Sequence, residues 1–385
     1  MKIDIHNKCS DFNSYRAARV KSLFNAENGC DFKINVELDI DDDSWQIGLI
    51  VGPSGSGKTS IGTKIFKGNK IYDFNAGWSK SKPIIDDISP SGDFNEVTGA
   101  LAAVGLGDVP SWLRPFNVLS NGQKFRAGLA KLICERPDCV VVDEFTSVVD
   151  RQIAKMGAQA FQKSWRRSCK GKKIVLLSCH YDIIDWLQPD WVFDTGTNNF
   201  ERGLLRQRPE INLQIWKVNS SYWRYFKQHY YLDLHMPPAA EYYVGTVDNE
   251  LVCHLAVAPF FTANSYRATR LVVMPEWQGV GVGTKFLEWV CEYYKLGKGR
   301  CGRLYPTMFH TSHPQLCNFL RNSKKWIQKS MQLYGGNKTK SAHSIKKARI
   351  KTGRKFSGSE RDMGCTTGYG GHFRAVQGFK YIGEK

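Results

Sequence analysis

The sequence predicts an α/β protein of two domains followed by a basic extension. Two observations lead to this prediction. A largely apolar run at 45–51 leads into a first glycine-rich loop at 52–59, and a second apolar run at 270–274 is followed by another glycine-rich loop at 278–283. A strand, a glycine-rich turn and a helix, in that order, are typical of α/β folds. With 385 residues the chain has room for two or three domains with cores of their own.

The first loop has the pattern of a P-loop, the phosphate-binding loop of many NTPases. Its glycines let the backbone curl so that N–H groups face a phosphate, and the helix that follows has its positive end at the same place. Lys58 is expected to reach the β- and γ-phosphates, and the Thr59 hydroxyl to ligate Mg²⁺. The residues expected to hold ATP are Gly52, Ser54, Gly55, Gly57, Lys58, Thr59 and Ser60.

Four further fragments accompany this loop. Cys139-Val140-Val141-Val142-Asp143-Glu144 is a buried strand that ends in two carboxylates, and Leu119-Ser120-Asn121-Gly122-Gln123 precedes a helical stretch. Ser147-Val148-Val149-Asp150 and Ser178-Cys179-His180 come later. Each fragment alone is weak, but five in the right order are specific.

Over roughly residues 30–200 the set resembles the ABC ATPases, with Asn121 where that family usually has glycine. The resemblance implies that Asp143 binds Mg²⁺, that Glu144 is the general base and that His180 senses the γ-phosphate. It also implies a homodimer that buries two ATP molecules, because Ser120 and Gly122 of one copy would contact the nucleotide of the other.

The chain departs from the ABC pattern in two respects. No glutamine occurs between Thr59 and Asn121, so Asp86, Asp87 or water would have to replace the family's Q-loop side chain. The 62 positions from Lys58 to Ser120 leave room for only a reduced helical subdomain. Transporter ATPases use that subdomain to grip membrane partners, so we expect a role without a membrane.

The second loop, Gln278-Gly279-Val280-Gly281-Val282-Gly283, lies between the strand 270–274 and an amphipathic helix at 284–290. This arrangement resembles motif A of the GNAT acetyltransferases, in which N–H groups at a helix N-terminus hold the pyrophosphate of acetyl-CoA. Dinucleotide binding and a plain tight turn are the alternatives, and the strands at 250–258 and 270–274 favour the acetyltransferase. The residues implied to bind acetyl-CoA are Gln278, Gly279, Gly281 and Gly283.

The GNAT resemblance runs from about residue 210 to 330 and leaves the general acid open. Where the family often supplies a tyrosine, the segment 311–320 has none. His310 and His313 are candidates because an imidazole can deprotonate an amine or protonate a thiolate at neutral pH. His229 and Tyr230 are similar to a His-Tyr element of Mom-like DNA-modifying relatives. For each of these histidines, packing in the fold is the competing interpretation.

Positive charge is concentrated at the C-terminal end. Residues 293–385 contain 20 Lys and Arg against three acidic side chains, whereas the whole chain has a net charge of +18. Such segregation is typical of proteins that bind polyanions, and DNA is favoured over RNA. The stretch 338–355 reads as a mobile basic arm, and the aromatic residues after it, Phe356, Tyr369, Phe373, Phe379 and Tyr381, are candidates to stack on unpaired bases. A solvated tail is the alternative.

Other features set the expected environment. The 11 cysteines are scattered without CxxC pairs, which favours reduced thiols and a cytoplasmic location. Neither a leader nor an 18-residue apolar run is visible. The adjacent Cys253 and His254 suggest a packed pair rather than a metal site. The expected domains are an ATPase at 1–203, a GNAT-like domain at 204–335, and an extension at 336–385 that is partly mobile and a candidate to complete the GNAT-like domain.

These features together predict an ATP-dependent acyl-CoA transferase, or a related modifying enzyme, that acts on or at nucleic acid. Such fusions resemble proteins from phages and bacteria. Two alternatives stay open: a nucleic-acid clamp whose GNAT-like part is an inactive scaffold, and a protein N-acetyltransferase.

Overall fold

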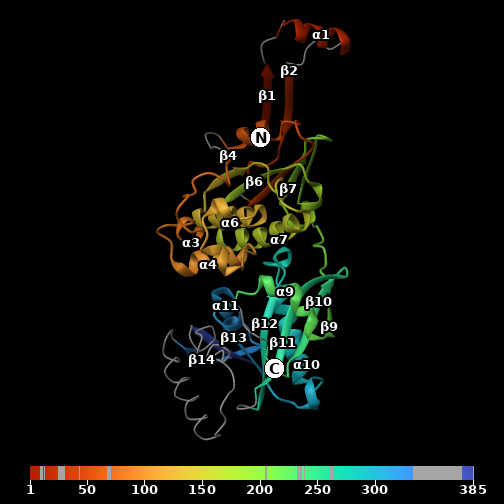
Figure 1. The fold of residues 1–385 in the computed structure, drawn as a ribbon. Helices are drawn as coiled ribbons and strands as arrows, with labels where there is room; N and C mark the ends of the chain where they lie inside the picture. The colour runs from red at the N-terminus through yellow and green to blue at the C-terminus, as the bar shows by residue number, and fades with distance from the viewer. Residues whose placement is uncertain are drawn as a thin grey trace. The chain divides into compact units, whose positions relative to one another are not determined.

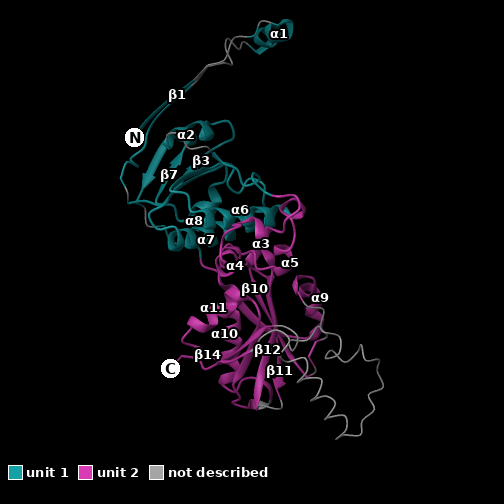
Figure 2. Ribbon diagram, turned by 90° about the vertical axis from the view of Figure 1, so that its left-hand side faces the viewer, with its two compact units in different colours: residues 1–78, 120–209 teal, residues 79–119, 210–385 magenta. Residues whose placement is uncertain are grey.

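The computed structural model forms two compact units (Figure 2). The described residues are 1–8, 12, 14–24, 31–42, 44–66, 71–203, 206–231, 236–237, 239–260, 264–332 and 375–384. Unit 1 comprises Met1–Trp78 and Ser120–Pro209, and unit 2 comprises Ser79–Leu119 and Glu210–Lys385. The segment 79–119, which interrupts unit 1 in the sequence, therefore packs with the second half of the chain. We call this segment the insert.

The core of unit 1 is a six-stranded sheet in the order β4-β5-β6-β3-β7-β8. Figure 1 labels β4, β6 and β7 of this sheet. The strands are β3 (Ile47–Val51), β4 (Ile71–Tyr72), β5 (Cys139–Val142), β6 (Lys173–Ser178), β7 (Trp191–Asp194) and β8 (Asn199–Arg202). Only β7 and β8 pair antiparallel. β3 is buried along its whole length, as expected for a parallel strand covered on both faces. The order places the ends of β5, β6 and β3 side by side.

Helices accompany this sheet, and two of them begin with a side-chain cap. The helices are α2 (Lys58–Ile65), α6 (Asn121–Glu135), α7 (Arg151–Ser168) and α8 (Ile184–Leu187). α6 begins with a capping box, in which the Ser120 hydroxyl accepts the Gln123 N–H and the Gln123 side chain accepts the Ser120 N–H. Asp150 caps α7 by accepting the Gln152 N–H at 2.8 Å. The caps fix where both helices begin, immediately beside the predicted motifs.

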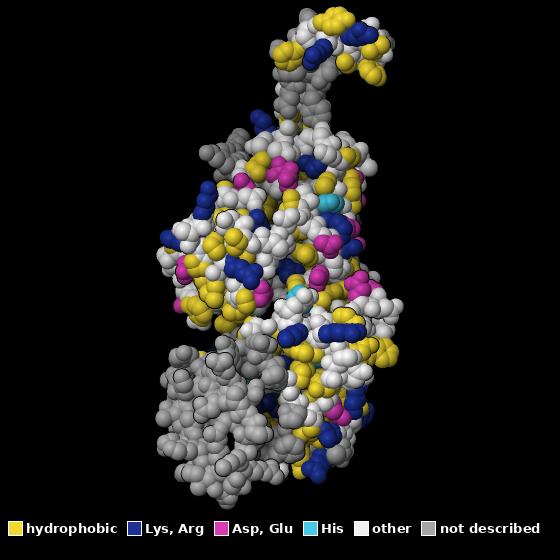
Figure 3. All heavy atoms as spheres, in the orientation of Figure 1, with side chains coloured by type: hydrophobic (Ala, Val, Ile, Leu, Met, Phe, Trp, Pro, Cys, Tyr) yellow, Lys and Arg dark blue, Asp and Glu magenta, His cyan; other side chains and the backbone are white. Residues whose placement is uncertain are grey.

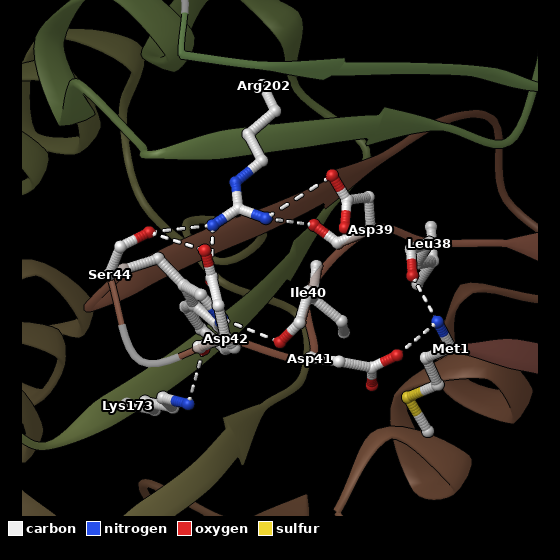
Figure 4. A network of polar contacts seen from close by, with 10 residues as sticks. Met1, Leu38, Asp39, Ile40, Asp41, Asp42, Ser44, Lys173 and Arg202 are labelled. Atoms are coloured by element: carbon white, nitrogen blue, oxygen red, sulfur yellow. Dashed lines mark hydrogen bonds and ion pairs between the residues drawn. The ribbon is translucent and has the colours of Figure 1, made fainter.

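The N-terminus of unit 1 is an antiparallel pair, β1 (Lys2–Lys8) and β2 (Asp31–Glu37). One end of the pair is anchored, since Ile3 and Val36 lie in the same core cluster as β3. Figure 4 shows the polar part of this anchor. The Met1 amino group donates to the Leu38 carbonyl at 2.6 Å, and Arg202 of β8 binds Asp39, Asp42 and Ser44.

Between β1 and β2 the chain forms α1 (Tyr15–Phe24), which has no buried residue. The helix presents hydrophobic side chains together with Lys and Arg at the surface (Figure 3).

The insert is a small helical body within unit 2. Its elements are α3 (Ile84–Asp87), α4 (Phe94–Ala103), α5 (Val109–Trp112) and η1 (Phe116–Val118). Ile84, Leu101 and Val104 are fully buried and Trp112 nearly so. The Ile84 N–H donates to the Arg114 carbonyl at 3.0 Å, which ties the first helix to the residues after α5.

A seven-stranded sheet in the order β14-β15-β13-β12-β11-β10-β9 forms the rest of unit 2. Its strands are β9 (Gln214–Val218), β10 (Glu241–Val247), β11 (Glu250–Phe260), β12 (Ser265–Val273), β13 (Thr307–Thr311), β14 (Trp326–Gln332) and β15 (Val376–Tyr381). The helices are α9 (Trp223–Phe226), α10 (Val282–Lys295) and α11 (Pro314–Asn322). β12 and β13 pair parallel, and every other neighbouring pair is antiparallel.

β15 inserts between β13 and β14. Phe379 and Tyr381 on it are buried, at 0% and 5% exposure, so their proposed role in stacking on bases is wrong. They are core residues of the sheet. The basic arm 338–355 and the aromatic residues Phe356, Tyr369 and Phe373 lie outside the described residues. Among the residues that are described, no helix has both the length and the apolar character needed to cross a membrane.

Candidate functional site

The P-loop connects β3 to α2 and has the shape of a phosphate cradle. Gly55 and Gly57 adopt left-handed φ angles of 79° and 87°, which favour glycine. Gly57 is the N-cap of α2, so the first N–H groups of that helix open toward the loop. At Gly52 a Cβ would come within 1.9 Å of the Thr195 hydroxyl. The backbone therefore follows the path that the sequence predicts.

Lys58 lies folded over this loop. Its ammonium group donates to the carbonyls of Gly52 at 2.8 Å and Pro53 at 2.7 Å. A bound phosphate would offer the same ammonium a charged acceptor, and charge-assisted hydrogen bonds are about twice as strong as neutral ones. Lys58 is thus placed to exchange carbonyl partners for phosphate.

Thr59 and Asp143 provide oxygen ligands for a hard cation. The Thr59 hydroxyl, at the start of α2, donates to the Asp143 carboxylate after β5 at 2.7 Å. One carboxylate and one hydroxyl fit Mg²⁺, which protein sites usually bind together with water and substrate phosphates. Among the described residues no group of three or more His, Cys, Asp or Glu could hold a metal by itself. Thr59 and Asp143 therefore suit an Mg²⁺ ion that binds together with a nucleotide.

Glu144 and His180 lie at the ends of the neighbouring strands β5 and β6. Glu144 is exposed and has a left-handed φ of 51°, while its N–H donates to Asp143 at 2.7 Å. His180 Nδ1 lies 3.3 Å from the Thr146 hydroxyl. Burial and the charge of Arg151 lower the pKa of His180, so this imidazole is neutral at pH 7. An exposed carboxylate and a neutral imidazole suit the roles of general base and phosphate sensor.

The predicted signature residues lie at the N-terminus of α6. Ser120 is exposed, and a Cβ on Gly122 would come 2.9 Å from Ile153 of α7. Val148, in the predicted D-loop, is 63% exposed. Asp87, a candidate to replace the missing glutamine, accepts the Ser79 N–H at 2.7 Å within the insert. The signature residues thus border an open surface of unit 1.

In unit 2 the second glycine-rich loop joins β12 to α10. Gly279 and Gly281 have φ angles of 89° and 88°, and Gly281 is the N-cap of α10. Around Gly281 the space is open, since a Cβ there would have the Thr284 hydroxyl at 3.9 Å as its nearest neighbour. A Cβ on Gly283 would instead come 2.6 Å from Val273, so this glycine allows the helix to pack closely on the strand. The N-terminus of a 14-residue helix therefore faces free space and suits a pyrophosphate.

Beside this loop the two parallel strands separate. β12 and β13 pair only over Tyr266–Ala268 and Thr307–Phe309. Just beyond, β12 has a bulge with Arg270 at φ 57°, where its register with β11 shifts between His254 and Ala256. Where two strands stop pairing, their backbone N–H and C=O groups can instead form hydrogen bonds with an extended ligand that has amide groups. The pantetheine arm of acyl-CoA is such a ligand, so the residues present fit this cofactor.

Two predicted catalytic side chains come close to this separation. His310 follows Phe309, the last residue of β13 that pairs with β12, and is itself paired with Gly378 of β15. Its Nε2 would lie 3.0 Å from a Cβ on Gly378, so glycine leaves room for the ring. The guanidinium of Arg270 stacks over the Tyr230 ring at 5.4 Å. Tyr230 therefore contacts the bulge of β12, and His310 lies on β13 just beyond the residues that pair with β12.

The other two histidines are placed differently. His229 lies 3.1 Å from the Gln228 amide on η4 (Lys227–His229). His313 caps α11, with Nδ1 accepting the Leu316 N–H at 3.5 Å, and its ring meets Trp112 of the insert at 5.6 Å. Burial lowers the pKa of His313. Catalytic roles for both stay predictions, and the contacts of His313 are those of a packed residue.

Cys253 and His254 are buried in β11, as the packed interpretation predicts. The His254 ring contacts Trp223 and Phe226, and its Nδ1 lies 3.2 Å from the Arg270 carbonyl. Since a carbonyl only accepts, Nδ1 carries the proton. Burial lowers the pKa of His254 to about 4.

One comparison with known proteins bears on the second half of the chain. A family model described as the acetyltransferase (GNAT) family matches residues 209–316. The chain therefore carries a GNAT domain. The match covers the splayed strands, the glycine-rich loop and the start of α11, and the fold of unit 1, with its P-loop, paired carboxylates and signature helix, is ABC ATPase-like. The GNAT match supports an acyltransferase activity.

Among solved structures the chain is similar to ABC proteins at low identity. One is the dimeric structure of MJ0796, a bacterial ABC transporter cassette (16% identity, TM-score 0.35, 44% of this chain and 92% of that chain). Another is cbiO1 from Clostridium perfringens, part of the ABC transporter complex cbiONQ (18% identity, TM-score 0.32, 43% and 76%). A comparison with curated proteins gave no match.

Proposed function

We propose that this chain is an ATP-dependent acyl-CoA transferase that modifies nucleic acid or a molecule bound to it. The proposal rests on one observation: a single chain contains both a GNAT domain and a P-loop. Beside the P-loop lie side chains that suit Mg²⁺ binding and the activation of water. Neither the GNAT domain nor the P-loop alone requires the other. Their combination favours a transfer reaction that nucleotide binding controls.

In the ATPase part, Lys58 and the P-loop amides bind phosphate, while Thr59 and Asp143 complete the Mg²⁺ shell that ATP brings. Glu144 polarises the attacking water. By the ABC resemblance, the exposed N-terminus of α6 receives the γ-phosphate of a second copy, and the predicted D-loop residue Val148 is also exposed. ATP then holds two copies together, and hydrolysis releases them.

In the transferase part, acyl-CoA binds with its pyrophosphate at the N-terminus of α10 and its arm along β12. The acceptor amine attacks the thioester carbonyl, the C–S bond breaks, and the thiolate takes a proton. His310, which follows the paired part of β13, is the candidate to take the proton of the amine. Tyr230, next to the bulge at Arg270, is the candidate to protonate the thiolate.

The proposal that the acceptor is nucleic acid rests on the positive charge of the C-terminal segment. Of the net charge of +18, the segment 293–385 contributes almost all, a distribution that favours a polyanionic partner. The competing function is a nucleic-acid clamp with an inactive GNAT scaffold, which the absence of tyrosine from α11 favours. Mass spectrometry of nucleosides from the DNA and RNA of cells expressing the parent or Gly281→Glu tests the proposal. A nucleoside of higher mass that requires the parent supports it, whereas identical profiles contradict it.

A further inference from the structure

The insert is connected to the ATPase at both ends and yet packs on the transferase. It begins at Ser79 and ends at Leu119, directly before the signature residue Ser120. In space it belongs to unit 2, where α4 packs against α11. Figure 2 shows the insert in the colour of the GNAT domain. The contacts it makes there fall on the predicted acyl-CoA site.

The first contact is with the glycine-rich loop. The Gly107 N–H donates to the side-chain oxygen of Gln278 at 3.0 Å, and the amide of the same side chain donates to the Val273 carbonyl at 3.0 Å. Gln278 thus bridges the insert and the end of β12. The backbones also touch, since a Cβ on Gly105 would come within 2.5 Å of the Gln278 carbonyl oxygen.

The second contact is with the start of α11. The Trp112 ring meets the His313 ring edge-on, and the Trp112 indole N–H donates to the Leu106 carbonyl at 2.8 Å. Because His313 Nδ1 accepts the Leu316 N–H, its proton is on Nε2, the atom that faces Gly107. The same short stretch, 105–112, therefore holds residues that follow β12 and residues that follow β13.

These two groups flank the place where β12 and β13 separate. The distance between the ends of the two strands decides whether an extended cofactor fits between them. A segment that contacts the residues following β12 and the residues following β13 can set that distance. Packed side chains and hydrogen bonds transmit a displacement because a close-packed body does not deform continuously.

We propose that the insert forms part of the acyl-CoA site and couples it to the nucleotide site. Residues 105–112 position the glycine-rich loop through Gln278 and position α11 through His313. When ATP engages Ser120, the insert shifts through Leu119 and changes the affinity for acyl-CoA. This inference rests on the proposed function, because it requires acyl-CoA to bind unit 2.

Coupling between two ligands is reciprocal, which allows a test without any change in the insert. Acetyl-CoA affinity is measured by calorimetry in the Glu144→Gln chain, without nucleotide and with ATP and Mg²⁺. The expected change is roughly fivefold or more, and ATP affinity must change by the same factor when acetyl-CoA is saturating.

Gly105→Ala then tests the path. This glycine has φ 85°, and the added methyl would push the insert away from Gln278. Gly171→Ala is the matched control, because φ is 74° there and nothing lies within 4 Å of the new methyl. We expect Gly105→Ala to reduce the coupling factor toward one and Gly171→Ala to retain it.

The outcomes separate the two proposals. Acetyl-CoA affinity that is equal with and without ATP, or full coupling in Gly105→Ala, overturns the inference and leaves the proposed function standing. Absence of acetyl-CoA binding under every condition overturns the proposed function and the inference together. If Gly105→Ala does not fold, the reciprocal measurement in the Glu144→Gln chain still overturns the inference when acetyl-CoA affinity is the same with and without ATP.

Discussion

The Thr59 hydroxyl donates a 2.7 Å hydrogen bond to the Asp143 carboxylate across 84 positions of sequence. The pair joins the P-loop helix to the end of β5 at the place where Mg²⁺ is expected. Thr59→Ala removes one oxygen ligand and the partner of Asp143. We expect ATP hydrolysis to fall by roughly a hundredfold, the scale on which one transition-state contact acts. The matched control is Thr63→Ala on the same helix, whose hydroxyl donates to the Ser60 carbonyl. Equal rates for both variants would contradict the Mg²⁺ role.

A second prediction concerns the dimer. Glu144→Gln removes the charge that polarises water and keeps the side-chain shape, so ATP and Mg²⁺ should trap a dimer before hydrolysis. Sedimentation velocity at saturating ATP should show twice the monomer mass. Lys58→Ala in the same background should abolish the dimer because it weakens phosphate binding. A Glu144→Gln chain that stays monomeric rules out the ABC-type dimer.

The glycine-rich loop of unit 2 gives a third prediction. Gly281→Glu places bulk and negative charge in the open space at the N-terminus of α10, so acetyl-CoA affinity should fall by at least a hundredfold, or about 3 kcal/mol. Gly281→Ala introduces the same backbone strain at φ 88° without the charge. Calorimetry of both variants gives two acetyl-CoA affinities. Their difference measures the effect of the bulk and charge of the Glu side chain, because the backbone strain is common to both. Similar affinities for both would place the pyrophosphate elsewhere.

His254 makes stability depend on pH. Burial lowers its pKa to about 4 in the folded chain, while the unfolded imidazole has a pKa near 6.5. Below pH 6.5 the unfolded state binds the proton and the folded state does not, so this contribution to stability is lost as the pH falls from 6.5 to about 4. The loss is on the order of 3 kcal/mol. His254→Asn keeps a donor for the Arg270 carbonyl and does not titrate. Urea unfolding should show a shallower decline for His254→Asn over this range, and parallel curves would contradict the assignment.

The basic arm carries the prediction for nucleic acid. Reversing the charge of Lys346, Lys347 and Arg349 to Glu should weaken binding to DNA of any sequence. If the arm makes about six phosphate contacts, affinity of the parent should fall roughly a thousandfold between low and physiological salt. Fluorescence anisotropy across a salt series measures both effects.

The control for the arm is a triple reversal of equal charge at Lys80, Lys82 and Lys170, which are exposed. A general effect of net charge would weaken binding equally in both variants. Unchanged DNA affinity in the arm variant identifies 338–355 as a solvated tail and removes the main support for a nucleic-acid partner.

The P-loop and the strand ending in Asp143 were predictable because their signals are local: a buried strand, left-handed glycines and polar side chains at fixed spacing. The GNAT loop was predictable for the same reason. The bond between Gly107 and Gln278 was not, since 171 positions separate them and nothing in either sequence identifies the other. The basic composition around Phe379 favours a role in stacking on bases, but its strand inserts between β13 and β14.

The capping of α11 shows the same limit for single residues. His313 precedes Pro314 and is a catalytic candidate with packing as the alternative; its Nδ1 accepts an N–H of its own helix and its ring packs on Trp112. The proline at the first turn was the available signal for a helix start. The partner in the insert could be found only from the fold.

The central claim is that one chain transfers an acyl group from CoA under the control of ATP. The most direct test incubates the parent, Gly281→Glu and Lys58→Ala with radiolabelled acetyl-CoA and DNA, with and without ATP and Mg²⁺, and counts label in the purified nucleic acid. The account predicts label only for the parent and only with ATP. Label that is independent of ATP, or that persists in Gly281→Glu, would contradict it, as would an unlabelled acceptor in every sample.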